Sequence, residues 1–364
     1  MSRRKWLWLL APVPLVGVAM IRVGETTVPP RDTPRPPHPQ LDLSGFSEAA
    51  PPRPLRLLFI HHSVGGQLLA TPGPNDGGNS IHRTFPTGGG LRDLLEAHGW
   101  EVHEASYGSV VGERTDPPDF VETFGSRMDR VLSTEHQDET YEGAARNDVV
   151  MFKSCFPAND FVGEGTPPGD PRSYERTVAN EQAALRALLP HFAEHPDTLF
   201  VYLTAPPMPP RVGGKRLWRV AWDALRGRGA GEDHARRAAR LARRFNDWVV
   251  DPEDGWLADY DGDNVVAFDY YDVLTGHGRS DLSYYPTDDG WDAHPSREGQ
   301  AIAARELRSF LNRAVRRAGL VEDAGDVEDT GDVEDTGAPS AAREPSPDGD
   351  RTVAARRSGS RSER

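Results

Sequence analysis

Short runs of apolar residues, alternating with stretches of helical periodicity, constrain the fold of this chain most strongly. The runs cover residues 55–60, 148–152, 198–203 and 264–268. Continuous apolar runs of this length are typical of strands that are buried on both faces of a parallel sheet. Residues 101–107 are less apolar, and they predict an edge strand.

Helical patterns lie between these runs. The first covers residues 91–98, and the last ends near Gly319, which suits a helix C-cap. For the second helix we predict Ser173 as the N-cap. Apolar residues mark one face of the second helix (Val178, Leu185, Leu188, Leu189, Phe192), the third (Leu241, Phe245, Trp248) and the last (Ala303, Leu307, Phe310, Leu311, Ala314). Alternating strands and helices predict an α/β fold, a three-layer sandwich around a central parallel sheet.

The N-terminal region predicts export. Residues 2–5 are Ser-Arg-Arg-Lys, and residues 6–21 are apolar but fewer than the roughly 20 that a membrane span needs. We interpret residues 1–22 as a signal peptide or an N-terminal membrane anchor, a choice that stays open. Residues 23–54 are rich in proline and predict an extended, semi-rigid linker. The expected location is periplasmic, in the cell envelope or extracellular.

The C-terminal region has the composition of a disordered tail. Gly-Asp-Val-Glu-Asp-Thr occurs at residues 325–330 and again at 331–336, and a polar, arginine-rich end follows. One valine per repeat cannot bury enough apolar surface to offset the loss of chain entropy. We therefore predict one folded domain at residues 55–320 and a disordered tail at 321–364. The net charge of −14 argues against a nucleic-acid partner.

Ligands of open parallel sheets bind at the carboxyl ends of the strands, so the residues that follow the apolar runs are the candidates for chemistry. Ser63 follows the first run, after His61 and His62. Gly108 follows the second strand and Asn159 the third. His294 precedes the last helix, and Asp292 stands two residues before it. Each has an ordinary structural explanation by itself: a helix cap, a turn glycine, an Asn-Asp turn and a loop histidine.

Together these four positions resemble the conserved blocks of the SGNH (GDSL-like) hydrolases. The most specific match is Asp-Ala-His-Pro-Ser-Arg-Glu-Gly at residues 292–299. The resemblance implies a flavodoxin-like sandwich and ester hydrolysis without a metal or cofactor. It also implies Ser63 as the nucleophile and His294 as the base. The Ser63 N–H, Gly108 and Asn159 would then form the oxyanion hole.

Two features depart from that family. His61-His62 stands before the serine, where Gly-Asp is usual, giving His-His-Ser in place of Gly-Asp-Ser. The aspartate usually lies three residues before the histidine, a position that Trp291 occupies. We predict that Asp292 orients His294. Asp289, or a Ser–His dyad without a carboxylate, remains open.

The predicted activity is hydrolysis of acyl esters by an exported serine esterase, with a polysaccharide or cell-wall glycan as the expected acyl carrier. An O-acetyltransferase would use the same residues, and a non-catalytic glycan-binding envelope protein is a further alternative. A metal-dependent hydrolase would draw its ligands from His61, His62, His82, His103, Asp292 and His294, but their spacing matches no metal motif. The sequence does not indicate an oligomeric state.

Two further hypotheses concern the surroundings of the predicted site. Residues 206–233 form a long insertion with Trp218 and Trp222, and packing or a lid over the site would both explain it. Trp291, Tyr284 and Tyr285 are expected near the substrate because they precede His294. Cys155, the chain's sole cysteine, is expected to serve packing rather than catalysis.

Overall fold

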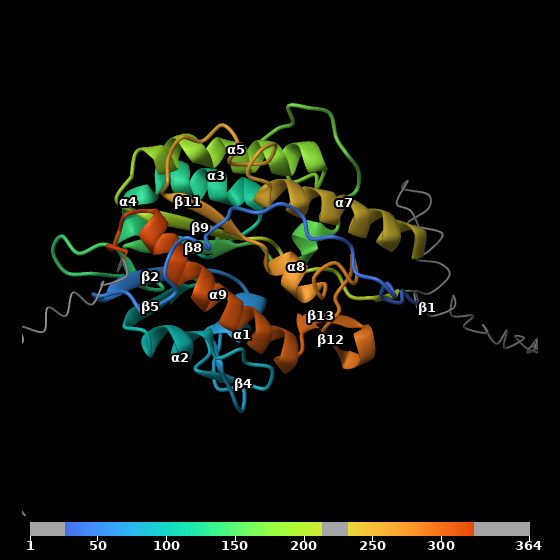
Figure 1. Cartoon of the computed structure of the whole chain (residues 1–364), viewed down its shortest axis with the longest axis horizontal. Coiled ribbons are helices and arrows are strands. Elements are labelled where there is room, and N and C mark those ends of the chain that lie inside the picture. The colour runs from blue at the N-terminus through green and yellow to red at the C-terminus, as the bar shows by residue number, and fades with distance from the viewer. Residues whose placement is uncertain (1–25, 213–231, 324–364) are drawn as a thin grey trace, which may run out of the picture. The chain divides into compact units, whose positions relative to one another are not determined.

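A computed structural model describes residues 26–212 and 232–323 of the chain. Within these ranges a five-stranded parallel sheet lies between two layers of helices (Figure 1). The strands are β2 (Leu55–Ile60), β5 (Trp100–Ala105), β8 (Val149–Lys153), β9 (Leu199–Leu203) and β11 (Val265–Phe268). The predicted three-layer α/β sandwich is therefore confirmed, and β5 is an edge strand as expected.

The spatial order of the strands is β11-β9-β8-β2-β5, and all neighbouring pairs are parallel. In order along the chain this is 2-1-3-4-5, the flavodoxin-like arrangement. The chain reverses its direction across the sheet between β2 and β8. In such sheets a ligand binds beyond the carboxyl ends of the strands at this point of reversal.

Each face of the sheet packs against its own helices because residues alternate sides along a strand. Leu57, Phe59 and Met151 face α1 (Val64–Leu69), α2 (Leu91–Glu96), α8 (Tyr270–Leu274) and α9 (Arg297–Arg317). Leu58 and Phe152 face the opposite layer, which contains α3 (Pro117–Ser126), α4 (Met128–Ser133), α5 (Val178–Ala193) and α7 (Glu232–Val250). Figure 1 shows the two layers above and below the sheet.

Small elements connect this framework. They are β1 (Thr26–Thr27), β3 (Thr71–Pro72), β4 (Thr84–Phe85), β6 (Thr134–His136), β7 (Glu139–Thr140), the 3₁₀ helix η1 (Phe156–Asn159), β10 (Arg211–Val212), β12 (Pro286–Thr287), the 3₁₀ helix η2 (Asp288–Gly290) and β13 (Asp292–Pro295).

One helix start differs from the prediction. Helix α5 begins at Val178, and Thr177 is its N-cap, accepting a hydrogen bond from the Asn180 N–H. Ser173 instead lies in the preceding loop, where its hydroxyl accepts a hydrogen bond from the Glu175 N–H. The other predicted end is as expected, since Gly319 follows α9 with a φ of 69°.

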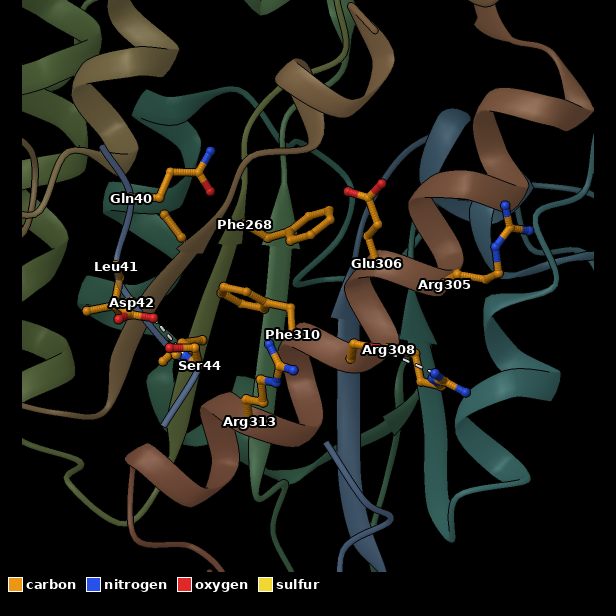
Figure 2. A pocket seen from close by; sticks show the side chains of 13 residues that line it. Gln40, Leu41, Asp42, Ser44, Phe268, Arg305, Glu306, Arg308, Phe310 and Arg313 are labelled. Carbon is orange, nitrogen blue, oxygen red and sulfur yellow. Dashed lines mark hydrogen bonds between the residues drawn. The ribbon is translucent and has the colours of Figure 1, made fainter. Parts of the chain in front are cut away.

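The described part of the proline-rich segment, residues 26–54, packs along the domain instead of projecting from it. Leu43 is buried in the core, and Leu41 and Phe46 pack against the same cluster. Figure 2 shows Leu41 and Asp42 across from Phe268 and Phe310, which line a cavity of about 480 Å³. These contacts make residues 26–54 part of the folded body. They therefore do not act as a spacer that holds the domain at a distance.

The predicted signal or anchor, almost all of the predicted tail, and Trp218 and Trp222 of the insertion lie outside the described residues. In the ranges that the structure does cover, no helix combines the length and the hydropathy that crossing a bilayer requires.

Candidate active site

Ser63 stands between the end of β2 and the first turn of α1, where the backbone bends sharply. Its φ of 22° and ψ of −80° fall outside the regions that residues with a side chain usually occupy. Strain of this kind costs about 1–3 kcal/mol and persists only where the surrounding structure enforces it. Here β2 and α1 enforce it from both sides, since the His61 N–H donates to Ala105 and the Gly65 N–H donates to His62.

His294 reaches Ser63 from the opposite end of the chain. It lies on β13, which pairs with β12 in a short antiparallel hairpin, and the Thr287 hydroxyl donates to its carbonyl oxygen. Ser296 then begins α9 by accepting a hydrogen bond from the Gly299 N–H. This arrangement places His294 Nε2 2.9 Å from Ser63 Oγ.

Asp292 holds the other side of the imidazole. Its Oδ1 lies 2.6 Å from His294 Nδ1 and also accepts the His294 backbone N–H at 3.0 Å. Partial burial alone would raise the pKa of Asp292, but these hydrogen bonds outweigh it and lower the pKa. Asp292 is therefore ionised at neutral pH. With Nδ1–H donated to Asp292, Nε2 is left to accept the Ser63 hydroxyl proton.

The structure thus brings Ser63, His294 and Asp292 together in hydrogen-bonding order. Asp289 is exposed in η2, and its backbone carbonyl accepts a hydrogen bond from Arg211. Among the described residues, no interaction joins the Asp289 side chain to His294.

Asn159 lies at the end of η1 but does not present its amide to the site. Its Nδ2 donates to the carbonyl oxygens of Ala205 and Pro206 at 2.7 and 2.9 Å, and its Oδ1 accepts a hydrogen bond from Asn246. The side chain is buried, so these bonds use its donors within the fold. In the predicted oxyanion role the Asn159 amide would face the substrate. In the structure η1 turns the amide toward the chain that follows β9.

Gly108 is also engaged. It has a φ of 84°, and its N–H donates to Glu113 Oε2 at 2.6 Å. In the covered ranges the backbone N–H of Ser63, by contrast, has no acceptor within hydrogen-bonding distance. Of the three predicted oxyanion donors, only the Ser63 N–H is therefore free in this structure.

Asn79 is a residue that the sequence analysis did not identify. Its Nδ2 lies 3.5 Å from the position that a Cβ on Gly108 would occupy, and no hydrogen bond to its amide is present in the described part of the chain. Asn79 and Ser80 both have positive φ, 55° and 63°. The Ser80 carbonyl packs so tightly on Gly66 of α1 that a Cβ there would lie 1.8 Å away. In the sequence, Gly-Gly-Asn-Ser reads only as a loop.

The two histidines before Ser63 point to opposite sides of the sheet. His61 is fully buried beneath α1, and its Nε2 lies 2.9 Å from Glu104 Oε2. The ring of His62 stacks on Tyr107 with centroids 3.6 Å apart, and its Nε2 donates to the Gly112 carbonyl at 2.7 Å. Burial lowers the pKa of His61, and it lowers the pKa of His62 to about 4.

Cys155 lies beside Ser63, with Sγ 3.9 Å from Ser63 Oγ and 3.6 Å from Lys153 Nζ. Lys153 is fully buried, and burial lowers its pKa. Cys155 is half-buried, and His294 hydrogen-bonds to Ser63 rather than to this thiol.

The aromatic residues expected near the site differ in their positions. Phe156, which was not predicted, packs edge-on to the His294 ring at 5.5 Å. Trp291 lies under the Arg211 guanidinium. Tyr284 and Tyr285 pack so closely on Gly276 and Gly299 that a Cβ on either glycine would lie within 3 Å of the ring. Each of these rings therefore packs on backbone, Tyr284 after α8 and Tyr285 at the start of α9.

The histidines considered as metal ligands do not gather at one point. His82 packs against Phe85, and His103 packs against Tyr141. Across residues 26–212 and 232–323, no group of three or more His, Cys, Asp or Glu side chains has an arrangement that could hold a metal ion.

Comparison with known proteins leaves the family open. No protein-family model matches the chain, and no curated protein matches it. One solved structure with weak similarity comes from a study of a carbohydrate esterase with divergent catalytic and non-catalytic binding functions. It is 13% identical, with a TM-score of 0.29, and the alignment covers 72% of this chain. The chain spans 65% of the length of that structure.

Proposed function

We propose that this chain is an exported serine esterase of the SGNH type, in which Ser63 attacks an acyl ester and His294 carries the proton. The observation that carries the proposal is the Asp292–His294–Ser63 hydrogen-bond series, at 2.6 and 2.9 Å. Its place at the reversal point of the sheet, where ligands bind, also supports an active site. A serine hydroxyl needs such a base because it is a poor nucleophile while it keeps its proton.

The reaction follows from these contacts. His294 Nε2 takes the Ser63 hydroxyl proton as Oγ bonds to the acyl carbon, which forms a tetrahedral oxyanion. As the C–O bond to the alcohol breaks, the imidazolium gives its proton to the leaving oxygen. Water then attacks the acyl-enzyme, with His294 again as the base. This releases the acid and restores the Ser63 hydroxyl. Asp292 stabilises the imidazolium in both steps.

For the oxyanion we propose the Ser63 N–H and the side-chain amide of Asn79 as donors. In the described part of the chain both are unused, whereas the amide of Asn159 and the N–H of Gly108 are bonded elsewhere. An amide N–H aimed at the developing negative charge is the usual device for acyl transfer.

The acyl carrier that we propose is a polysaccharide or cell-wall glycan, an expectation that follows from the predicted export of the chain. Release of acetate into solution, instead of its transfer to a sugar hydroxyl, would separate the esterase from the O-acetyltransferase that shares its residues.

The test is hydrolysis of p-nitrophenyl acetate together with labelling by a fluorophosphonate. Wild-type protein should hydrolyse the ester and be labelled at Ser63. Ser63→Ala and His294→Ala should show neither hydrolysis nor labelling. Ser133→Ala, a change on α4 away from the site, is the matched control and should retain them. Equal rates in all four proteins would rule out the proposed function.

A further inference from the structure

The exposed large apolar side chains of the described residues lie in two loops, and one of them, Tyr107, contacts the residue before Ser63. They are Tyr107, Val110, Val162 and Tyr174, and they lie in the loops that follow β5 and β8. These loops stand at the carboxyl edge of the sheet, on either side of the strand that leads to Ser63, because β2 lies between β5 and β8. An exposed apolar surface next to a candidate active site indicates a place where substrate binds.

The two tyrosines of this group are held in fixed orientations although they are exposed. Tyr107 is 38% exposed, and its ring stacks on His62, the residue before Ser63. Tyr174 is 57% exposed, yet its hydroxyl donates to Asp119 Oδ1 at 2.5 Å and accepts from Arg114 at 3.2 Å. An aromatic ring that is already immobilised loses little conformational entropy when a ligand stacks on it.

Asp116 is the N-cap of α3, the helix that follows the Tyr107 loop. Burial raises the pKa of Tyr107, and the Asp116 carboxylate adds to that effect. For Tyr174 the hydrogen bond to Asp119 is the main cause of a raised pKa, and Asp116 again contributes. The hydrogen bond of Tyr174 to Asp119 places this ring at the first turn of α3, a helix that begins ten residues after Tyr107.

Tyr174 also borders a groove on the outer side of α3 and α5. The groove has a volume of about 510 Å³, within the range of roughly 300–1,000 Å³ found for small-ligand sites. Gly125 on α3 makes room for the ring of His191 on α5, because a Cβ at Gly125 would lie 3.2 Å from His191 Nε2. The remaining lining combines apolar with polar side chains of both charges (Pro118, Val121, Glu122, Ser126, Arg172).

This lining suits a sugar chain better than an acyl chain or a polyanion. An acyl chain would match neither Arg172 nor the ion pair that Glu122 forms with Arg127, and a polyanion would be repelled by Glu122. Sugar rings offer a C–H face to stack on tyrosine and hydroxyls that both donate and accept hydrogen bonds. The mixture of carboxylate, guanidinium, imidazole and hydroxyl groups matches those hydroxyls.

We propose that the groove between α3 and α5 binds a glycan strand, with Tyr174 as its stacking platform and Tyr107 as a second platform next to Ser63. A strand that follows this path places an ester-bearing sugar near Tyr107 and further sugars on Tyr174. The assignment of the bound ester to Ser63 rests on the proposed esterase function, whereas glycan binding by the groove does not. The substrate class is then an acylated oligosaccharide of several residues.

The test uses the Ser63→Ala protein, so that binding is measured without turnover. Isothermal titration with cellohexaose, xylohexaose and chitohexaose, each against its own disaccharide, should show tighter binding of at least one hexasaccharide. Tyr174→Ala in this background should weaken hexasaccharide binding by about tenfold, the effect of one lost aromatic contact, and leave disaccharide binding unchanged. Tyr174→Phe keeps the ring and should retain part of the gain.

Glu139→Gln is the matched control, because Glu139 is exposed on β7 and does not line the groove. It should bind all sugars as the parent does. Failure of every hexasaccharide to bind, or equal binding by the Tyr174→Ala protein, would overturn the glycan groove.

The outcomes separate this inference from the proposed function. Hexasaccharide binding that depends on Tyr174, in a protein whose wild type does not hydrolyse p-nitrophenyl acetate, would reject the esterase and keep the groove. Normal hydrolysis with no effect of Tyr174→Ala on hexasaccharides would reject the groove and keep the esterase.

Discussion

The imidazole of His61 and the carboxylate of Glu104 form a buried pair beneath helix α1, with Nε2 and Oε2 2.9 Å apart. The second oxygen of Glu104 accepts a hydrogen bond from Arg92 on α2. His61 fills the space under α1 so closely that a Cβ on Gly65 would lie 2.4 Å from the Cβ of His61. His61 and Gly65 therefore pack as one unit, which fixes the start of α1 and the turn that carries Ser63.

We expect Glu104→Leu to lower the free energy of unfolding by about 3–5 kcal/mol, because it leaves His61 and Arg92 without their buried acceptor. Urea unfolding followed by circular dichroism measures the change. Glu101→Gln on the same strand is the control, since Glu101 is exposed, and it should differ from wild type by less than about 1 kcal/mol. Similar stability of the two variants would show that the pair does not hold α1 in place.

The two asparagines near the site should respond differently to truncation. Asn79→Ala should reduce kcat for p-nitrophenyl acetate by about 10²–10³ with little change in stability, because it removes a proposed oxyanion donor from an exposed loop. Asn159→Ala should reduce the free energy of unfolding by about 1–3 kcal/mol, since Ala205, Pro206 and Asn246 lose their partner. Its kcat should fall by less than about tenfold.

Steady-state kinetics and thermal melts of both variants decide between the roles. A loss of about 10²–10³ in kcat for Asn159→Ala, with normal turnover by Asn79→Ala, would return the oxyanion role to Asn159. The hydrogen bonds of Asn159 to the chain after β9 would then have to break when substrate binds.

Ser63 should be a position where activity and stability oppose each other. Its φ of 22° is strained for any residue with a Cβ, and glycine has no such restriction. Ser63→Gly should therefore be more stable than Ser63→Ala, with a free energy of unfolding about 1 kcal/mol higher, while both variants lack esterase activity. A lower melting temperature for the glycine variant would show that the backbone at Ser63 is relaxed.

The strands were predictable because burial on both faces leaves a direct trace, a short run without polar residues. β2 at Leu55–Ile60 matches its predicted range. Strands β8, β9 and β11 each begin one residue after the start that the sequence predicts. Packing of the N-terminal segment was not predictable in the same way. Its prolines indicate extended chain, but whether Leu43 finds a surface depends on α9, more than 250 residues further along.

The residues of the site also differ in how far the sequence predicts them. Ser63 and His294 follow from strand ends and a family-like motif, whereas the choice of Asp292 over Asp289 depends on the β12–β13 hairpin. That hairpin directs the His294 N–H and ring to the same carboxylate oxygen. Asn79 left no signal because an unpaired amide in a loop looks like any turn residue. The partners of Asn159 come from residues 205, 206 and 246, which no local pattern connects.

Glu181, in the first turn of α5, should make the protein less stable as the pH rises. The side chain is 3% exposed, and burial together with the nearby Asp116 raises its pKa from 4.5 to about 8. Between these pH values the folded protein keeps a proton that the unfolded chain has lost, so the free energy of unfolding decreases as pH increases from about 4.5 to about 8.

Glu181→Gln removes this titration and should be more stable than wild type at pH 8 by an amount on the order of a few kcal/mol, with the difference shrinking toward pH 4.5. Urea unfolding at a series of pH values measures it. Glu194→Gln, at the exposed C-cap of the same helix, should follow the wild-type curve. Parallel curves for wild type and Glu181→Gln would mean that Glu181 is ionised in the folded protein, with the nearby Arg176 as the charge that balances it.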